Sequence, residues 1–387
     1  MDHNVIKVLN LRTFFIFTLL LHIVKRKGEF MKVCVYAISK NEEKYVKQWV
    51  SSMREADEIY VLDTGSTDNT VSLLKEEGVY VEEEVISPWR FDVARNRSLQ
   101  LVPKDCDICV CTDFDEVFES GWREKIEKAW TSNTTRCQYT YHWSLDDKNQ
   151  PIISFFLNQV HKRDGYQWTH PVHEVLSYTL GEEVIVSCPD VILKHYPDAS
   201  KSRTSYLPLL ELSVSEDPED DRNVHYLGRE YMYYQMWDKS IEMLKKHLRL
   251  PRATWKDERA ASMRFIGRCY KNLKNYQEAR CWYDLAIKEA PYLRDAFVER
   301  ALMEYELKNY EDVEKLCFQA LEIKTHQKTY INEPFSWDST IYDLLSISAY
   351  YLKRYSQAVY FVDIALTFHP GDERLLNNRK LFKEKES

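Results

Sequence analysis

The chain has 387 residues, which is enough for two domains that each bury a core. Its formal net charge of −8 argues against a nucleic-acid-binding protein, which would carry a basic surface. Nine glycines leave no glycine-rich phosphate loop. The nine cysteines include the CxxC pair Cys106 and Cys109, but no second pair or histidines follow closely at zinc-ligand spacing. We therefore expect reduced thiols and a cytoplasmic protein.

Residues 1–30 differ from the rest of the chain. Residues 14–24 are a mainly apolar run followed by Lys25, Arg26 and Lys27. The run is shorter than the ~20 residues of a membrane-spanning helix, and its basic cluster follows it, unlike that of a signal peptide. We expect Met31 to be the physiological start, or residues 1–30 to be a loosely attached extension. The alternative is weak peripheral membrane association through residues 14–24, and no integral membrane insertion is expected.

Between residues 31 and 193 short apolar runs alternate with amphipathic stretches. Strands are expected at residues 32–38, 58–62, 79–81 and 108–112, and helices at residues 42–55, from 68–70 onward, and at 91–102. This alternation predicts a mostly parallel sheet with helices on both faces. Ligands of such sheets bind at the carboxyl ends of the strands, where polar clusters stand at residues 39–42, 63–68 and 113–116.

The expected strand over residues 108–112 ends in Asp113-Phe114-Asp115. Two carboxylates at i and i+2 of an extended chain point the same way, so they are expected to hold one hard cation, Mn²⁺ or Mg²⁺. Such an ion would neutralise a diphosphate leaving group. A solvated acidic turn is the alternative. The position after a buried strand of the fourth strand–helix unit favours the metal site.

Three other charged residues stand near strand or helix ends. Asp63 ends the second expected strand, and we expect its carboxylate to accept from the imide N–H of uracil. Asp68 is expected only to cap the next helix. Arg95 lies on the first turns of the helix at residues 91–102, where a phosphate or a carboxylate is the expected partner. The alternative for Arg95 is a loop-steadying pair with Asp92.

Beyond about residue 197 the chain is helical and repetitive. Gly267 and Ala301 hold the same place in successive copies, 34 residues apart. Small residues at fixed places let paired helices approach closely, and this period resembles that of the tetratricopeptide repeat over residues 222–372. Residues 325–337 interrupt the array between its third and fourth copies. Such repeats stack into a curved array with a concave binding face.

Residues 31–200 resemble the family 2 glycosyltransferases of the GT-A fold. The motifs that carry the resemblance are AISKNEE, VLDTGSTDNT, FDVARN and DFDE, at residues 37–43, 61–70, 91–96 and 113–116. The attached repeats, together with WTHPVHE and LKHYPD, make the chain similar to the S-glycosyltransferases that modify bacteriocin peptides. The resemblance implies an α/β GT-A domain followed by an all-α tetratricopeptide-like domain. The expected division is an extension at 1–30, the transferase domain at 31–200, a linker helix at 201–221 and the repeats at 222–387.

The resemblance also implies roles for individual residues. Asp115 is expected to be the main metal ligand, Asp113 to reach the ribose or the metal, and His195 to complete the metal site, with a purely structural role as the alternative for His195. The expected lining of the nucleotide pocket is Ser39, Asn41, Glu42 and Asp63, with Arg95 as a further cofactor-binding residue.

The sequence lacks the acidic pair that follows the DxD region in many family members. Glu174 and His173 are the candidate bases instead. The alternative for His173, and for His170, is packing with aromatic neighbours such as Trp168. A thiol acceptor would need little help from a base. Other aromatic residues are candidates for stacking on sugar or acceptor, with core packing favoured: Tyr139, Tyr141 and Trp143.

The expected function is metal-dependent, inverting transfer of a hexose from a nucleotide-diphospho-sugar, with a UDP-hexose preferred, to an acceptor. The favoured acceptor is a Cys or Ser side chain of a peptide or protein bound by the repeats. The alternatives are a glycan- or lipid-linked acceptor of polysaccharide assembly and a non-catalytic scaffold. A homodimer formed through the repeats is a further alternative, and no nucleic-acid partner is expected.

Overall fold

The computed structural model describes residues 31–198, 206–327 and 329–386. The extension at 1–30, with its apolar run, and the linker residues 199–205 lie outside the described residues. Within the described part of the chain, no helix is both long and apolar enough to cross a membrane. All nine cysteines lie in that part, and each is a free thiol.

The N-terminal half is built on one mixed sheet of eight strands in the order β3-β2-β1-β4-β7-β6-β10-β5. The first four strands pair in parallel, as expected: β1 (Val33–Ser39), β2 (Glu58–Asp63), β3 (Tyr80–Glu83) and β4 (Ile108–Cys111). The other four are β5 (Glu116–Phe118), β6 (Arg136–Leu145), β7 (Pro151–Lys162) and β10 (Ile185–His195). Strand β7 runs antiparallel to both β4 and β6. The second half of the sheet is mixed, because β6 and β7 form a long antiparallel hairpin, whereas β10 pairs parallel with β6 and antiparallel with β5.

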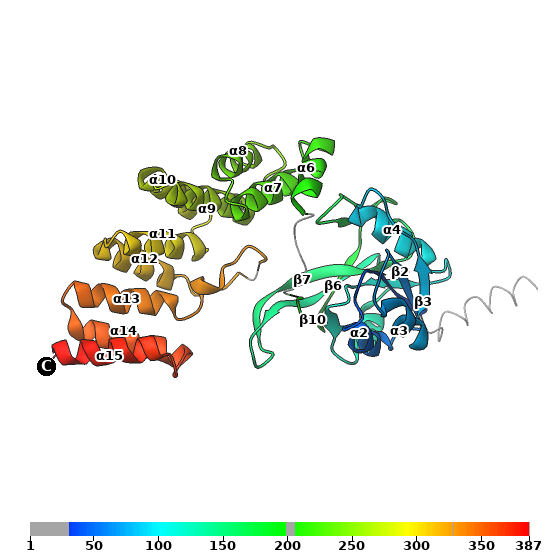
Figure 1. The fold of residues 1–387 in the computed structure, drawn as a ribbon, viewed down its shortest axis with the longest axis horizontal. Coiled ribbons are helices and arrows are strands. Elements are labelled where there is room, and N and C mark those ends of the chain that lie inside the picture. The colour runs from blue at the N-terminus through cyan, green and yellow to red at the C-terminus, as the bar shows by residue number, and fades with distance from the viewer. Residues whose placement is uncertain (1–30, 199–205, 328, 387) are drawn as a thin grey trace, which may run out of the picture.

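Helices and a small second sheet cover the two faces of the large sheet (Figure 1). One face packs on α2 (Val46–Met53), α3 (Thr70–Glu76) and α5 (Trp122–Ala129). The other packs on α4 (Phe91–Leu101) and on the pair β8 (Tyr166–Thr169) and β9 (Val175–Tyr178). Alternation along β1 feeds both layers, because Val33 and Val35 face α2 whereas Cys34 and Tyr36 face α4.

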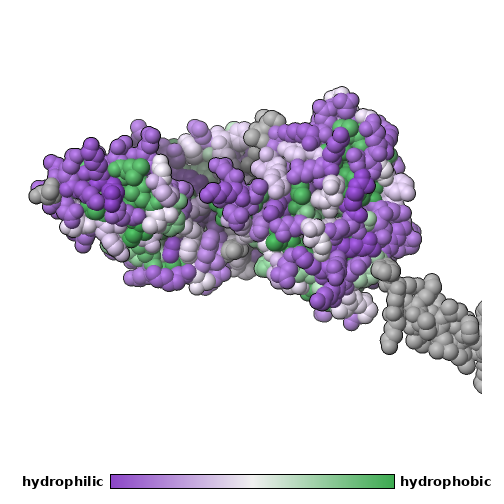
Figure 2. All heavy atoms as spheres, turned by 90° about the horizontal axis from the view of Figure 1, so that it is seen from below, coloured by the Kyte–Doolittle hydropathy of each residue, from purple (hydrophilic) through white to green (hydrophobic). Residues whose placement is uncertain are grey.

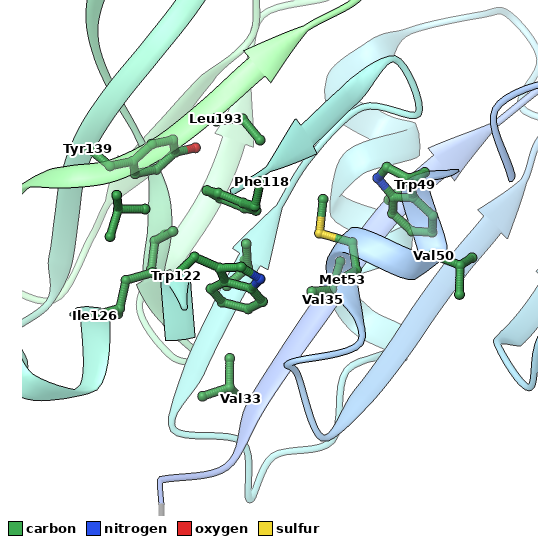
Figure 3. Close-up of a cluster of buried hydrophobic side chains, with 14 of the residues drawn as sticks. Val33, Val35, Trp49, Val50, Met53, Phe118, Trp122, Ile126, Tyr139 and Leu193 are labelled. Atoms are coloured by element: carbon green, nitrogen blue, oxygen red, sulfur yellow. The ribbon is translucent and has the colours of Figure 1, made fainter. Parts of the chain in front are cut away.

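The core under α2 and α5 is dominated by two tryptophans (Figure 3). Trp49 and Trp122 are fully buried, and Trp122 stacks on Phe118 with ring centroids 5.0 Å apart. Each indole N–H has a partner, since Trp49 donates to Thr112 Oγ1 and Trp122 to a backbone carbonyl. Truncation of either side chain to alanine would cost about 3–5 kcal/mol of stability. This layer fixes the positions of α2 and of the start of β5, next to the Asp113-Phe114-Asp115 triplet.

The C-terminal half is a stack of helix pairs that runs from green to red in Figure 1. It opens with α6 (Tyr206–Glu216), inside the region expected to be a linker helix. Four pairs follow, and α15 (Glu373–Glu386) closes the stack; the pairs are α7 (Asp221–Tyr233) with α8 (Trp237–His247), α9 (Lys256–Asn272) with α10 (Tyr276–Glu289), α11 (Asp295–Glu306) with α12 (Tyr310–Glu322), and α13 (Thr340–Tyr351) with α14 (Tyr355–Phe368). The interruption at 325–337 is irregular apart from the short helix η1 (Pro334–Ser336).

Two glycines explain how closely the paired helices approach. A Cβ at Gly228 would lie 2.6 Å from Leu244 of the partner helix, and one at Gly267 would lie 3.0 Å from Tyr283. The small residues that mark the repeat in the sequence are therefore packing positions. The face shown in Figure 2 is mostly hydrophilic, with apolar patches that include one over the C-terminal helices.

A buried chain of hydrogen bonds ties β1 to β7 and β8. Trp168 Nε1 donates to the Tyr36 hydroxyl at 2.9 Å, and that hydroxyl lies 2.8 Å from His161 Nε2. His161 Nδ1 faces the Lys162 carbonyl, which only accepts, so Nε2 carries the lone pair and Tyr36 donates to it. Burial lowers the pKa of His161 to about 3, which keeps the ring neutral.

The substitution Tyr36→Phe is expected to lower the free energy of unfolding by about 2–4 kcal/mol, because it leaves two buried nitrogen groups without partners. Urea denaturation followed by tryptophan fluorescence measures this change. Tyr80→Phe removes a hydroxyl from an exposed ring and is expected to change stability by less than about 0.5 kcal/mol. Equal stability of the two variants would contradict the role of Tyr36.

Candidate functional site

The carboxyl ends of β2, β1 and β4 lie side by side in the sheet. Ser39 and Asp63 are register neighbours there, and Ser39 Oγ donates to Asp63 Oδ2 at 2.8 Å. Asp63 also accepts from the backbone N–H groups of Gly65 and Ser66 and from Ser66 Oγ. Four donors thus engage a carboxylate with about four lone-pair sites. A bond from a uracil imide to Asp63 would first require one of these bonds to break.

Asn41 and Glu42 join the loop after β1 to the loop after β2. Asn41 Oδ1 accepts from Thr67 N at 2.7 Å, and its own N–H donates to Ser66 Oγ at 2.8 Å. Asn41 has a φ of 57°, a left-handed conformation that asparagine tolerates better than most residues. The backbone N–H of Glu42 donates to Thr70 Oγ1 at 2.7 Å. The structure therefore brings together the four residues expected to line the nucleotide pocket: Ser39, Asn41, Glu42 and Asp63.

Asp68 lies one residue before Asn69, the N-cap residue of α3, and its carboxylate still accepts from the first backbone N–H of the helix. Its Oδ1 accepts from the backbone N–H of Thr70 at 3.0 Å, at the first residue of α3. Its Oδ2 lies 3.3 Å from the N–H of Glu43. The carboxylate is thus used to hold two loops together.

The DxD triplet lies in a turn between β4 and β5, where Glu116 N donates to the Asp113 carbonyl at 3.1 Å. The expectation that both carboxylates point the same way along an extended strand is therefore wrong. Phe114 is buried and stacks on Trp49 with ring centroids 4.3 Å apart. This ring anchors the turn, and the two aspartates on either side of it reach different partners.

Asp115 faces His195, the last residue of β10. The Oδ2 atom of Asp115 lies 3.5 Å from His195 Nε2, and the Tyr196 N–H donates to the Asp115 carbonyl at 2.7 Å. His195 Nδ1 lies 3.0 Å from the Trp143 carbonyl oxygen, to which it must donate. The neutral ring therefore carries its lone pair on Nε2, toward Asp115.

A carboxylate oxygen and an imidazole nitrogen at this separation fit one divalent cation. Bonds of about 2.1 Å to a shared ion place two neighbouring ligand atoms about 3 to 3.5 Å apart. Burial disfavours protonation of His195, but the Asp115 carboxylate and the Trp143 carbonyl outweigh it and raise the pKa of the ring. A cation bound here would have to displace that proton. Residues Asp115 and His195 are thus the pair that could hold a metal ion, with Asp113 close by in the same turn.

Glu116 is a site residue that the sequence did not single out. It is buried at the start of β5, and its Oε2 accepts from the Asp113 N–H at 2.8 Å. Burial raises the pKa of Glu116 to about 8, and the negative charge of Asp113 contributes to the rise. Its position next to the DxD triplet was a visible signal, but its burial was not.

Arg95 links the turn to the candidate base. Its guanidinium is 5% exposed, and it donates to Asp113 Oδ1 at 2.7 Å and to Glu174 Oε1 at 2.9 Å. The expected carboxylate partner is therefore found, and it is not Asp92, which pairs with Arg90 instead. The side chain of Glu174 is 13% exposed. One buried cation thus holds a DxD carboxylate and the candidate base within reach of each other.

Comparison with known families identifies this half of the chain. Residues 34–175 match the sequence profile described as Glycosyl transferase family 2, and the match includes the DxD turn, Arg95 and Glu174. Residues 34–175 are a family 2 glycosyltransferase domain. The chain therefore contains a family 2 glycosyltransferase domain, which is followed by a tetratricopeptide-like helical region. No curated protein matches the chain.

Solved structures similar to the chain align with a large part of their own length. MamA has 18% identity and a TM-score of 0.36, with 46% of this chain and 99% of that chain covered. PilF of Pseudomonas aeruginosa has 11% identity and a TM-score of 0.35, with coverages of 46% and 72%. The TPR domain of Arabidopsis OM64 has 20% identity and a TM-score of 0.29, with coverages of 33% and 98%.

The loop between β8 and β9 carries the other candidate base and docks the glycosyltransferase domain on the helical region. His173 stacks on Tyr226 of α7 with ring centroids 4.3 Å apart. His170 contacts α7 too, since its Nδ1 lies 3.0 Å from Asn223 Nδ2 and its Nε2 lies 3.4 Å from Asp220 Oδ2. Aromatic packing, the alternative to catalysis for His173, is therefore present, although its partner is Tyr226 rather than Trp168. The geometry favours Glu174 over His173 as the base.

Asn96 of the FDVARN motif fixes the start of the same loop in the glycosyltransferase domain. Its Nδ2 donates to the Trp168 carbonyl and its Oδ1 accepts from the Trp168 N–H, both at 2.8 Å. Trp168 itself is buried, so its ring is a core residue. The motif thus places Arg95 and the loop that carries Glu174 from neighbouring positions on α4.

The aromatic residues of β6 divide into core and surface. Tyr139 and Tyr141 are buried, as the core-packing alternative predicted. Trp143 is 47% exposed and stacks on His195 with ring centroids 4.5 Å apart. Of these three residues, Trp143 is the one that offers a ring face to a sugar beside the candidate metal ligands.

A cavity of about 560 Å³ lies between the β6–β7 hairpin of the glycosyltransferase domain and the irregular segment before α13. Its hairpin side includes residues 151–154, and its helical side includes His326, Trp337 and His369. His142 Nδ1 lies 2.7 Å from Ser154 Oγ across the hairpin, next to Trp143. The β6–β7 hairpin therefore runs from this cavity to Trp143, whose carbonyl oxygen binds His195 Nδ1.

Proposed function

We propose that this glycosyltransferase moves a hexose from a UDP-sugar, with inversion, to a Cys or Ser side chain of a peptide, and that it requires Mn²⁺ or Mg²⁺. The observation that carries the proposal is the buried Arg95 that joins Asp113 to Glu174 beside the Asp115–His195 pair. A displacement reaction needs stabilisation of the charged leaving group and a base for the acceptor, both near one carbon atom. In the proposal, Asp115 and His195 hold the cation that stabilises the leaving diphosphate, and Glu174 is the base.

In this proposal, the nucleotide-sugar donor binds at the edge of the sheet formed by β1, β2 and β4. We propose that the loops containing Ser39, Asn41, Glu42 and Asp63 bind the nucleotide, and that the diphosphate lies against Asp115 and His195. A cation there would neutralise the charge of the departing diphosphate. Asp113 pairs with Arg95, and we propose that it contacts the ribose side of the donor.

In this proposal, Glu174 is the base that activates the acceptor. Its carboxylate is oriented by Arg95 and lies mostly away from solvent, so it is suited to take a proton from the attacking hydroxyl or thiol as the bond to the anomeric carbon forms. The attack from the face opposite the diphosphate inverts the anomeric configuration. A thiol acceptor would depend less on this base, because its thiolate is already nucleophilic.

The cavity between the hairpin and the helical region is the proposed binding site for the peptide around the acceptor residue. Its lining combines apolar surface with Trp337, His326 and acidic side chains. The hairpin gives a continuous path from the cavity to Trp143 beside His195. The alternative is a glycan- or lipid-linked acceptor, and the test below distinguishes it from a peptide.

Mass spectrometry of cysteine- and serine-containing peptides, incubated with a panel of nucleotide-hexoses, tests the proposal. We expect a single hexose addition with a UDP-sugar, and at least about a hundredfold loss when EDTA removes the metal. Trp337→Ala is expected to slow peptide modification without slowing UDP release in water, whereas Tyr360→Ala, on an exposed position of α14, should change neither. Metal-independent transfer, or modification of lipid-linked glycans alone, would contradict the proposal.

A further inference from the structure

Three side chains of metal-ligand type meet inside the first helix pairs, away from the DxD turn. They are His225 of α7, His247 of α8 and Glu258 of α9, and one potential ligand atom from each lies within 4.8 Å of the other two. All three are buried, and the two histidines have no exposed surface. Each comes from a different helix, so the cluster is created by the stacking of the repeats.

The distances within the cluster approach those of a coordination shell. His247 Nε2 lies 3.4 Å from Glu258 Oε1. Two ligands bound to one tetrahedral Zn²⁺ at about 2.0–2.1 Å are separated by about 3.4 Å. This edge of the tetrahedron is therefore already formed, and His225 offers a third ligand atom within 4.8 Å of the other two.

Ser262 turns both imidazole rings toward the centre of the cluster. Its Oγ lies 2.7 Å from His225 Nδ1 and 2.8 Å from His247 Nδ1. A hydroxyl oxygen accepts two hydrogen bonds, so both Nδ1 atoms can donate to it, which leaves a lone pair on both Nε2 atoms. A hydrogen bond to the far ring nitrogen is the usual way in which a protein orients a histidine ligand.

The His225 Nε2 atom has no hydrogen-bond partner among the described residues, although it is completely buried. A buried polar atom without a partner is rare, and an unseen ion is one of its standard explanations. His247 Nε2 is also buried without a hydrogen-bond partner, since its contact with Glu258 Oε1 at 3.4 Å is not a hydrogen bond. One nitrogen of each ring is therefore left unsatisfied in the cluster.

Tyr330 also orients the carboxylate of the cluster. Its hydroxyl donates to Glu258 Oε2, which leaves Oε1 directed at His247 Nε2, 3.4 Å away. The cluster therefore offers one carboxylate oxygen and one nitrogen of each imidazole ring within 4.8 Å of one another.

We propose that His225, His247 and Glu258 bind one Zn²⁺ ion, with a water molecule as fourth ligand, and that this ion cross-links α7, α8 and α9. Two imidazole nitrogens and one carboxylate oxygen form a common zinc ligand set. The ion would also fix the start of α7, where Asn223 and Asp220 contact His170 of the glycosyltransferase domain. The proposal does not depend on the proposed transfer reaction, because the cluster and the DxD turn share no residue.

Metal analysis of tag-free protein, purified without chelators from zinc-supplemented cells, tests the proposal. We expect about one zinc per chain in the wild type and in Asp115→Asn, and less than about a tenth in His225→Gln and Glu258→Gln. Circular dichroism checks that each variant is folded. Removal of zinc should lower the Tm of the wild type by several degrees, and added Zn²⁺ should restore it.

A second measurement avoids the variants altogether. Zinc-depleted wild-type protein titrated with Co²⁺ should develop the strong visible absorption of four-coordinate cobalt at about one equivalent, and Zn²⁺ should abolish it. Folded wild-type protein that holds no transition metal after purification, and that takes up neither ion in titration, would overturn the proposal. The same result would assign the cluster to the metal-free hydrogen-bond network.

Discussion

Asp115→Asn is expected to lower the rate of donor turnover by about a thousandfold or more, which corresponds to about 4 kcal/mol of lost transition-state stabilisation. The amide keeps the size of the side chain but removes the negative charge that faces His195 Nε2 at 3.5 Å. The fold should persist, because Phe114 and Glu116 hold the turn independently of that charge. Release of UDP at saturating Mn²⁺ measures the effect.

Glu119→Gln is the matched control for this experiment. Glu119 follows β5, pairs with Lys194 at 2.8 Å and is partly exposed, so its charge lies outside the candidate site. The donor turnover of the Glu119→Gln variant should stay within about twofold of that of the wild type. Manganese titration should show weakened binding in Asp115→Asn alone. If Asp115→Asn kept more than a tenth of the wild-type rate, Asp115 would not be a metal ligand.

Arg95→Ala is expected to lower both stability and activity. It leaves Glu174 and Asp113 without their shared cation, and removal of one partner from a buried ion pair costs about 3–5 kcal/mol. The proposed base also loses the group that orients it, and a misplaced catalytic group costs about a hundredfold in rate. Urea denaturation gives the first effect, and initial rates below the unfolding transition give the second.

Arg95→Lys separates charge from geometry in the same experiment. A single ammonium group restores the positive charge but cannot make both planar contacts that the guanidinium makes at 2.7 and 2.9 Å. We expect it to recover more stability than activity. The role assigned to Arg95 would be wrong if the alanine variant, shown to be folded, transferred sugar at the wild-type rate.

Local patterns in the sequence were enough to predict the first half of the sheet and the helix pairs. The strands before Asp63 and Asp113 are apolar runs with polar residues at their ends, and the repeat marks Gly267 and Ala301 as packing positions. These features depend on residues close together in the chain. The position of the candidate metal ligands at the edge of the sheet follows from the same patterns.

Contacts between distant segments were beyond the reach of those patterns. The bond between Arg95 and Glu174 joins residues 79 positions apart, and the sequence offered Asp92 as an equally suitable partner. The turn at the DxD triplet depends on burial of Phe114 against Trp49, which an acidic motif does not reveal. The docking of His173 on α7 likewise requires the placement of one domain on the other.

The loop from His170 to Glu174 connects the proposed base, Glu174, to the helical region as well as to the glycosyltransferase domain. Glu174 is held by Arg95 inside the glycosyltransferase domain, while His170 and His173 are held by α7. A ligand that favours one orientation of α7 would therefore alter the affinity of the catalytic domain for its own substrates, and thermodynamic linkage makes the effect equal in both directions. The helical region and the candidate site are thus expected to be coupled energetically through this short loop.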